Sequence, residues 1–379
     1  METGLGGQRW DDYVLRRGDD FFLFWKELLS SSTRDLLFVV GQGFDPRMKV
    51  GVEAILNSGG NGRRNCVVIQ FDEGAISPSR LHDALLKENF DGLQSHFTKA
   101  GEFITKRVQM WSKDGRRRTG SRNVASVFES PADLAGYTDV VVDISAMPRT
   151  LYMPLIAKLL HLVDHWNFDS KVPNIHVVVS DDPDFDQSIT GQGLDEDASY
   201  IHGFESGIQL EATANIPRVW MPILGEGKVS HFERIYDLVN PDEVAPILPF
   251  PCLRPRRTDD LFVEYRSHLM DRLRIEPRNF LFVPEQNPFG VYRQVTTAVK
   301  HYSDALQPLG GCKVILSALS SKLISLGCLL AAYELKRMDL TVGIAHVHST
   351  GYRMAGTMPD RVSLFEAWLS GDCYEKEKD

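Results

Sequence analysis

Cysteine is sparse in this 379-residue chain, and its five cysteines form no C-x-x-C pair and no paired spacing. Cys66 and Cys312 begin apolar segments and Cys328 lies inside one, so we expect them to be small buried hydrophobes. Unpaired thiols of this kind are typical of a reducing compartment. We therefore expect a cytoplasmic protein without structural disulfides.

Long apolar runs and an excess of positive charge are also missing. No stretch of 18 apolar residues occurs, and the N-terminus lacks the apolar run of a signal peptide. The formal charge is −9, which argues against a broad surface for nucleic acid. One basic segment runs from Lys113 to Arg118, with Arg122 beyond it, and a solvated loop explains it more simply. We expect no membrane contact and no nucleic-acid partner.

The composition is that of a soluble globular protein, with 43% hydrophobic and 25% charged residues. Because single cores stop growing at about 250–300 residues, a chain of this length has room for two. A Pro- and Arg-rich stretch from Pro249 to Arg257 marks the expected boundary. The sequence thus predicts an N-terminal domain at 1–250 and a smaller C-terminal domain at 258–370.

Short, continuously apolar runs followed by helical patterns recur along the chain, which is typical of buried parallel strands in α/β proteins. We expect strands at 36–40, 66–71, 140–142, 174–180, 218–224, 244–248, 280–283, 312–316 and 340–345. Helices are expected at 20–29, 48–57, 79–88, 90–110, 148–160, 228–239, 260–273, 291–306 and 322–336. The acidic segment 184–215 lacks periodicity and is expected to be a lid, a partner-binding loop or disordered. The predicted fold is α/β, with two Rossmann-like lobes, mainly parallel sheets and helices on both faces.

Two short segments of the first predicted lobe resemble segments of the second. Leu37-Phe38-Val39 resembles Leu281-Phe282-Val283, and Ser145-Ala146 with Arg149 resembles Ser317-Ala318 with Lys322. Either the chain contains a duplicated unit, or two unrelated halves share the common strand–turn–helix pattern.

The first candidate site follows the first predicted strand. Gly41 and Gly43 flank a Gly-x-Gly turn whose backbone amides could hold a phosphate. The dinucleotide fingerprint is incomplete, since its third glycine would fall on Pro46, and a tight turn is the alternative. Arg47 suits bidentate recognition of an anion, and Asp45 is a candidate acid or base.

The second candidate site follows the strand at 140–142, where open α/β sheets bind ligands. Asp143 is a candidate acid or base, and Ser145 and Arg149 are candidate ligand-binding residues. Asp181 ends the next predicted strand. Carboxylates gathered at one sheet edge could bind a ribose, hold Mg²⁺ or transfer protons, whereas helix capping explains each one singly.

The third candidate site lies near the C-terminus. Ser317, Ser321 and Lys322 would form a phosphate or ribose clamp at a helix start, with capping by serine as the alternative. Asn287 and Tyr352 are further ligand-binding candidates. The histidines form no metal-binding motif, and no metal site is expected from them.

The stretch 280–352, through Ser317–Lys322 to Gly351-Tyr352, resembles the Rossmann-like sensor domains called CARF. The resemblance rests on a small-residue turn with a lysine before an Ala/Leu-rich helix. It implies binding of cyclic oligonucleotides or related nucleotides, and frequent dimerisation. No effector nuclease or DNA-binding module accompanies it, so a partner protein would have to supply the output.

Three functions remain open. The first is a cytoplasmic nucleotide-binding or nucleotide-sensing protein, as a component of a prokaryotic antiviral defence or regulatory system and as a homodimer. The second is a hydrolase or transferase acting on a nucleotide or nucleoside, with Asp143 or Asp45 as acid or base and Arg47 and Arg149 holding phosphate. The third is a scaffold with a vestigial cleft.

Overall fold

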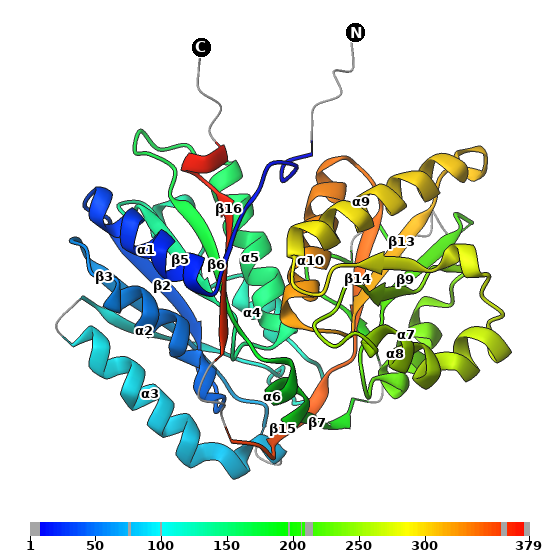
Figure 1. The fold of residues 1–379 in the computed structure, drawn as a ribbon, viewed down its shortest axis with the longest axis horizontal. Helices are drawn as coiled ribbons and strands as arrows, with labels where there is room; N and C mark the ends of the chain where they lie inside the picture. The colour runs from blue at the N-terminus through cyan, green and yellow to red at the C-terminus, as the bar shows by residue number, and fades with distance from the viewer. Residues whose placement is uncertain are drawn as a thin grey trace, which may run out of the picture. The chain divides into compact units, whose positions relative to one another are not determined.

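The computed structural model describes residues 8–74, 77–98, 101–195, 198–205, 207–208, 215–357 and 362–374. The chain forms two compact units, and neither is one continuous segment (Figure 1). Unit 1 comprises Met1–Tyr13 and Leu194–His348, and unit 2 comprises Val14–Gly193 and Ser349–Asp379. The expected boundary at 250–258 is wrong. It lies inside unit 1, because the strand before it, β11 (Ile247–Pro249), pairs with strands from both sides of the boundary.

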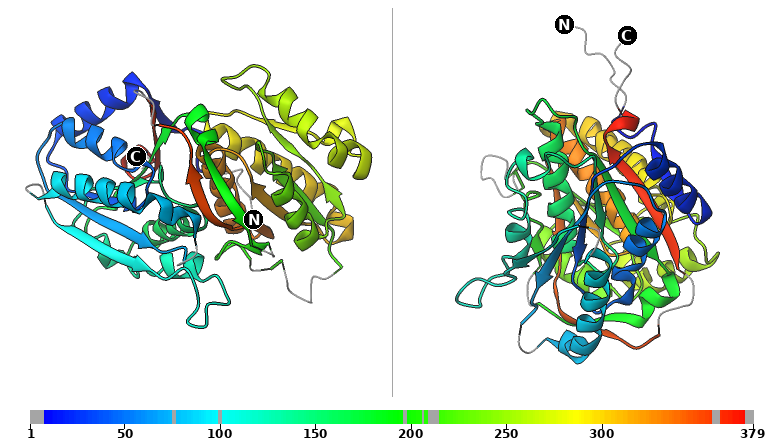
Figure 2. Two further views of the ribbon diagram at one scale, coloured as in Figure 1. Left: turned by 90° about the horizontal axis from the view of Figure 1, so that it is seen from below. Right: turned by 90° about the vertical axis from the view of Figure 1, so that its left-hand side faces the viewer.

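Unit 2 is built on five parallel strands that follow the expected apolar runs. They are β2 (Leu36–Gly41), β3 (Arg64–Phe71), β4 (Phe103–Val108), β5 (Asp139–Asp143) and β6 (Asn174–Asp181). Their spatial order is β4-β3-β2-β5-β6, the Rossmann order, with its topological switch point between β2 and β5. Two antiparallel strands, β16 (Ser363–Ser370) and β1 (Val14–Arg17), extend the sheet beyond β6, where β16 is drawn in red in Figure 2.

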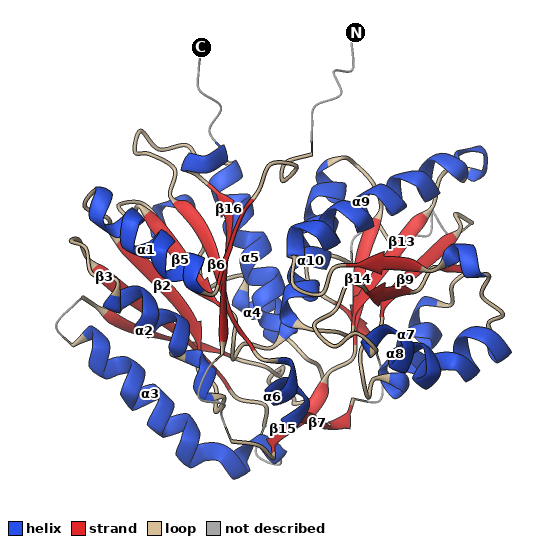
Figure 3. Cartoon of the chain, in the orientation of Figure 1, coloured by secondary structure: helices blue, strands red, loops and turns tan. Residues whose placement is uncertain are grey.

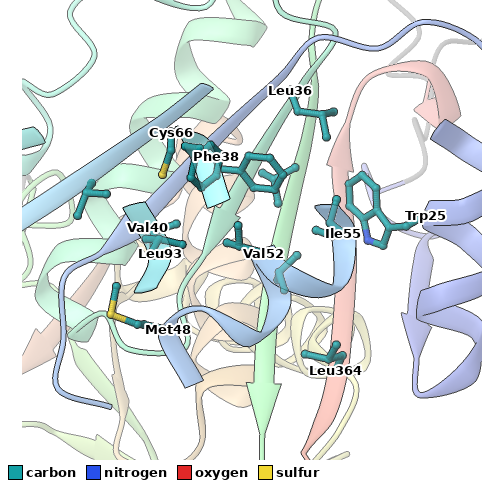
Figure 4. Packing of buried hydrophobic residues seen from close by; sticks show 14 of the residues in the cluster. Trp25, Leu36, Phe38, Val40, Met48, Val52, Ile55, Cys66, Leu93 and Leu364 are labelled. Atoms are coloured by element: carbon teal, nitrogen blue, oxygen red, sulfur yellow. The ribbon is translucent and has the colours of Figure 1, made fainter. Parts of the chain in front are cut away.

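Helices cover both faces of the unit 2 sheet (Figure 3). On one face lie α1 (Asp19–Ser31), α2 (Val50–Asn57) and α3 (Asp83–Phe97), and on the other α4 (Gly120–Val124) and α5 (Arg149–Asp164). Leu36, Phe38 and Val40 alternate along β2 and pack against Trp25 of α1 and Val52 of α2 (Figure 4). This spacing of two residues explains why one face of β2 belongs to that core.

Unit 1 repeats the same strand order. Its parallel strands are β9 (Arg218–Ile223), β11, β12 (Leu281–Val283), β13 (Lys313–Ala318) and β14 (Val342–His346), ordered β12-β11-β9-β13-β14. The short β10 (Glu243–Val244) also pairs with β9, and β8 (Ser199–Tyr200) pairs antiparallel with β14. The helices are α7 (Val229–Val239), α8 (Arg257–Arg266), α9 (Pro288–Ala305) and α10 (Lys322–Arg337). The predicted α/β class, with Rossmann-like lobes and mainly parallel sheets, is confirmed.

The shared strand order tests the two internal sequence similarities noted above. Ser145–Arg149 follows β5, and Ser317–Lys322 spans the last two residues of β13, the turn after it and the first residue of α10. β5 and β13 occupy equivalent positions in their sheets, so this match agrees with the topology. The other match is wrong, because Leu37–Val39 lies in β2, between β5 and β3, whereas Leu281–Val283 lies in β12 at the edge of its sheet. The counterpart of β2 is β9.

Two further expectations are wrong in detail. The helix predicted at 90–110 ends at Phe97 as α3, and β4 occupies Phe103–Val108. Because β4 is an edge strand with an exposed polar centre, it lacks the apolar run by which the other strands were recognised. The segment 184–215 contains α6 (Pro183–Ser188), β7 (Ile189–Leu194) and β8 among its described residues, while positions 196–197, 206 and 209–214 lie outside them. β7 pairs with β15 (Ser349–Met354), a strand that the sequence did not predict.

Candidate functional site

The loops at the switch point of unit 2 pack directly against each other. A Cβ atom added at Gly43 would lie 2.9 Å from the Cβ of Ala146, and one at Gly41 would lie 3.1 Å from Cγ of Met147. At Gly43 a side chain would force its neighbours to shift, and at Gly41 it would fit only if Met147 moved slightly. The Gly-x-Gly turn is therefore explained by the close approach of the β2 and β5 loops.

Arg47 and Asp45 form a buried ion pair. The Arg47 guanidinium is only 1% exposed, and its Nη2 lies 2.7 Å from Asp45 Oδ2 and 2.7 Å from Asp186 Oδ1. Its charge also lies 4.8 Å from the ring centre of Phe185. Asp45 additionally accepts the backbone N–H of Arg47 at 3.0 Å. These contacts make the pair a clamp that ties the β2 loop to α6.

Asp143 and Ser145 are buried in the same region. Asp143 accepts the backbone N–H of Ser145 at 2.9 Å, and a Cβ at Gly51 of α2 would lie 2.7 Å from its Oδ2. Ser145 Oγ accepts the N–H of Ser180 at 2.9 Å. Asp181 ends β6, opposite Ser363 of β16. This arrangement joins the ends of β5 and β6 and fixes their register.

Four side chains beyond the carboxyl ends of β3 and β5 lie close enough to interact electrostatically, and we call them the edge site: Glu73, Arg118, Arg149 and Tyr352. Glu73 follows β3 by two residues, and Arg149 opens α5 after β5. Tyr352 comes from β15 and Arg118 from the basic loop after β4. Strand, helix and loop thus bring together residues that lie far apart in the sequence.

Hydroxyl groups and an indole fix Glu73. Its Oε2 accepts hydrogen bonds from Ser79 Oγ at 2.5 Å and from Ser77 Oγ at 3.1 Å, and its carbonyl accepts Trp111 Nε1–H at 3.2 Å. Burial raises the pKa of the Glu73 carboxyl, while the two serines and Arg118 act in the opposite direction. A carboxyl in this setting can exchange a proton nearer to neutral pH than an exposed glutamate.

Arg118 is held in place rather than solvated. Its guanidinium carbon lies 3.8 Å from the ring centre of Trp111, and Nη2 donates to the Ser349 carbonyl at 3.4 Å. The expectation that this basic segment is only a solvated loop is wrong at Arg118.

The other three residues of the edge site all act electrostatically on the Tyr352 phenol. Burial raises the pKa of Tyr352, Glu73 acts in the same direction, and Arg149 and Arg118 act against it. The phenol therefore stays neutral near physiological pH and keeps its proton as a hydrogen-bond donor. Two guanidiniums and a phenol are the donors that proteins use for phosphate and carboxylate groups.

In unit 1 the corresponding hydroxyls have partners within the unit. Ser317 Oγ accepts Trp220 Nε1–H at 3.1 Å, and Ser321 caps α10 by accepting the Ile324 N–H at 3.4 Å. Lys322 is the first residue of α10. These residues belong to unit 1, whereas Tyr352 belongs to unit 2.

The remaining candidate of unit 1, Asn287, caps α9. Its Oδ1 accepts the Gly290 N–H at 3.0 Å, and its Nδ2 donates to the Tyr13 hydroxyl at 2.7 Å. Both polar ends of the amide are therefore used to hold local structure.

A buried arginine in unit 1 parallels Arg47. Arg257 Nη1 bonds Glu285, its Nε lies 2.6 Å from Glu226, and its Nη2 donates to Ser320 at 3.3 Å. As at Gly43, a Cβ at Gly225 would collide with the opposing loop, 2.0 Å from the Leu319 carbonyl oxygen. Both units thus close the switch point with a glycine contact and carry an arginine held by two carboxylates.

Sequence reasoning placed Glu73 at a strand end but did not select it, and it did not select Ser77, Ser79 or Trp111. The available signal was the position of Glu73 after a buried strand. Nothing in the sequence indicated β15, because only the folded structure shows that this strand lies near the end of β3.

Within the described parts of the chain, no group of three or more His, Cys, Asp or Glu side chains is arranged to hold a metal ion. None of the helices in those same parts is long and apolar enough to cross a membrane.

No model of a known protein family matches the chain, and no curated protein matches its sequence. A solved structure of a functionally unknown protein from Pseudomonas aeruginosa PAO1 aligns with 82% of this chain and 91% of its own chain, at 9% identity. The TM-score is 0.21, which carries no argument about fold or function. The case for function depends on the edge site itself.

Proposed function

We propose that unit 2 binds a small anionic ligand of the nucleotide class at the edge site. The observation that carries the proposal is the convergence of Arg118, Arg149 and the Tyr352 phenol beyond the carboxyl ends of β3 and β5. Ligands of open α/β sheets bind beyond the carboxyl ends of the strands, and guanidiniums are the preferred partners of phosphate oxygens.

The chemistry of the site favours a nucleotide over a simple anion. Glu73 brings a carboxylate close to the Arg118 guanidinium and the Tyr352 phenol, and a carboxylate accepts hydrogen bonds from sugar hydroxyls while disfavouring a second negative charge beside it. A ligand with a phosphate and a ribose would satisfy both kinds of group. Unit 1 is the weaker candidate, because its cluster of Ser317, Ser321 and Lys322 offers one cation, whereas the edge site has two guanidiniums.

A second candidate function is catalysis on the same ligand. Its support is Glu73, whose pKa burial raises and whose Oε2 is hydrogen-bonded to Ser77 and Ser79. Under this proposal Glu73, rather than Asp45 or Asp143, is the acid or base.

Thermal melting with a panel of nucleotides tests the binding proposal. A ligand at a hundred times its Kd adds about 2.7 kcal/mol to the free energy of unfolding. We expect a shift with at least one nucleotide. Arg149→Gln and Tyr352→Phe should abolish most of that shift, while Lys322→Ala in unit 1 should leave it unchanged.

Two results would contradict the proposal: no shift with any nucleotide, which favours a scaffold, or loss of the shift in Lys322→Ala alone, which moves the ligand to unit 1. Conversion of the nucleotide by the wild type but not by Glu73→Gln would favour the catalytic candidate.

A further inference from the structure

The strand that carries Tyr352 is fastened on one side by hydrogen bonds to a short helical turn. β15 pairs with β7 on its other side. Toward the turn Pro78–His82, the Tyr352 N–H donates to Ser79 Oγ at 2.9 Å, and the Met354 N–H donates to His82 Nε2 at 3.1 Å. Two alternate backbone donors of β15 are thus bound by two side chains of one turn.

The hydrogen bond from the Met354 N–H determines the protonation of the His82 Nε2 atom. A backbone N–H can only donate, so Nε2 must accept with its lone pair, and the ring must be neutral there. The His82 ring is also stacked on Phe44, with centroids 4.6 Å apart and planes at 29°. Phe44 lies in the β2 loop, so the ring is held between that loop and β15.

Protonation of His82 would convert this contact from attractive to repulsive. Nε2 would then carry a proton that faces the proton of the Met354 N–H, and the bond would be lost. Histidine is the side chain that ordinarily changes charge between pH 5 and 8.

The charged groups on the neighbouring elements are largely engaged with one another. On the turn itself and at the start of α3, Arg80 pairs with Asp72 and Asp83. In the β2 loop, Asp45 pairs with Arg47. On β15, Arg353 lies between the two fastened residues and is exposed.

We propose that His82 is a pH-dependent fastener of β15, and that its protonation releases Tyr352 from the edge site and weakens ligand binding in acid. The inference about ligand affinity rests on the proposed function, whereas the release of β15 does not. Ser79 links the two, because it accepts the Tyr352 N–H and donates to Glu73.

Hydrogen exchange of the intact protein, without ligand, tests the release. We expect the protection factors of the Tyr352 and Met354 amides, corrected for intrinsic exchange, to fall about two- to tenfold from pH 7.5 to pH 5.5, the fold-change that corresponds to a hydrogen bond of about 0.5–1.5 kcal/mol. In His82→Gln the amide oxygen can accept the Met354 N–H without titrating, so protection should stay high at both pH values. In His82→Phe it should be low at both.

A matched control is His96→Gln, which changes an exposed histidine paired with Glu53 on another part of α3 and should keep the wild-type profile. Equal protection in wild type at both pH values, or the same pH profile in His82→Gln as in wild type, would overturn the proposal.

The affinity for ATP, used as the probe nucleotide, tests the consequence. We expect ATP to bind wild type less tightly at pH 5.5 than at 7.5, and His82→Gln equally at both. If the exchange data follow the prediction while ATP and other nucleotides fail to bind at either pH, the fastener stands and the proposed ligand is wrong.

Discussion

A buried histidine in unit 2 gives the sharpest stability prediction. His176 on β6 is fully buried, with Nδ1 2.8 Å from Glu366 Oε1 and Nε2 3.3 Å from Asp139 Oδ1. Its ring lies 5.0 Å from those of Trp25 and of Trp368. Burial alone would lower the pKa of His176, but the two carboxylates outweigh it and raise the pKa to about 9.

The sign of the effect on stability follows from this rise. The unfolded chain has an ordinary histidine pKa of 6.5, so protonated His176 stabilises the fold fully below pH 6.5. That contribution is lost as the pH rises through about 9. The rise in pKa corresponds to about 3 kcal/mol in the free energy of unfolding. Asp139, with its pKa lowered to about 2, contributes above its unfolded value and loses that contribution as the pH falls through about 2.

The assay is urea denaturation of wild type and His176→Gln at pH 6 and pH 10. Glutamine does not titrate, so the tyrosines and cysteines that ionise near pH 10 affect both proteins alike. Wild type should lose about 3 kcal/mol more than the variant between the two pH values. His96→Gln, at an exposed pair with Glu53, should behave as wild type. Parallel losses in wild type and His176→Gln would refute the reasoning.

Three further substitutions, with one control, test the packing and ion pairs of the loops. Gly43→Ala should destabilise unit 2 by about 1–3 kcal/mol because its Cβ would meet Ala146. Gly92→Ala on α3, whose Cβ would meet only the flexible Lys49 side chain at 3.4 Å, should stabilise by about 0.5–1 kcal/mol. Urea denaturation measures both, and equal effects would contradict the packing argument. Arg47→Met leaves two carboxylates without their shared arginine and should cost about 3–5 kcal/mol. Arg257→Met should cost a similar amount in unit 1, and a loss below about 1 kcal/mol in either variant would show that the ion clusters are dispensable.

The parallel strands were predictable because burial on both faces leaves a local mark. Runs such as Val140–Val142 are continuously apolar and end at a turn, so each can be recognised without its neighbours. β4 and β15 were not recognised, because an edge strand and a two-stranded ribbon keep polar and glycine residues. Their position depends on partners distant in sequence.

Domain organisation failed for the same reason. The chain leaves unit 2 at Gly193 and returns to it at Ser349, and composition changes little at either point. The Pro- and Arg-rich stretch was the most conspicuous break in the sequence, yet its Arg257 is buried with two glutamates. A charged, proline-rich composition is typical of linkers but does not exclude an ion cluster inside a domain.

The candidate site was predicted in part. Arg149 was selected from its place after β5, and Tyr352 was selected as a further ligand-binding candidate near the C-terminus. Their association with Glu73 depends on β15 reaching the unit 2 sheet edge. Gly43 and Arg47 had the expected residue types, but their contacts serve packing and ion pairing. Residue type and strand position indicate which residues lie at the ligand-binding edge of a sheet. Only the contacts in the structure distinguish residues that could bind a ligand from residues that hold the fold together.

The most direct test of the edge site is the identity of the small molecule released when the purified full-length protein is denatured. Mass spectrometry of the released material should find a phosphate-bearing nucleotide in wild type and in Lys322→Ala. The same compound should be depleted at least tenfold in Arg149→Gln, as expected from losing a charge-assisted hydrogen bond worth about 1.5–3 kcal/mol. A retained compound without an anionic group, or one held equally by Arg149→Gln and wild type, would contradict the account.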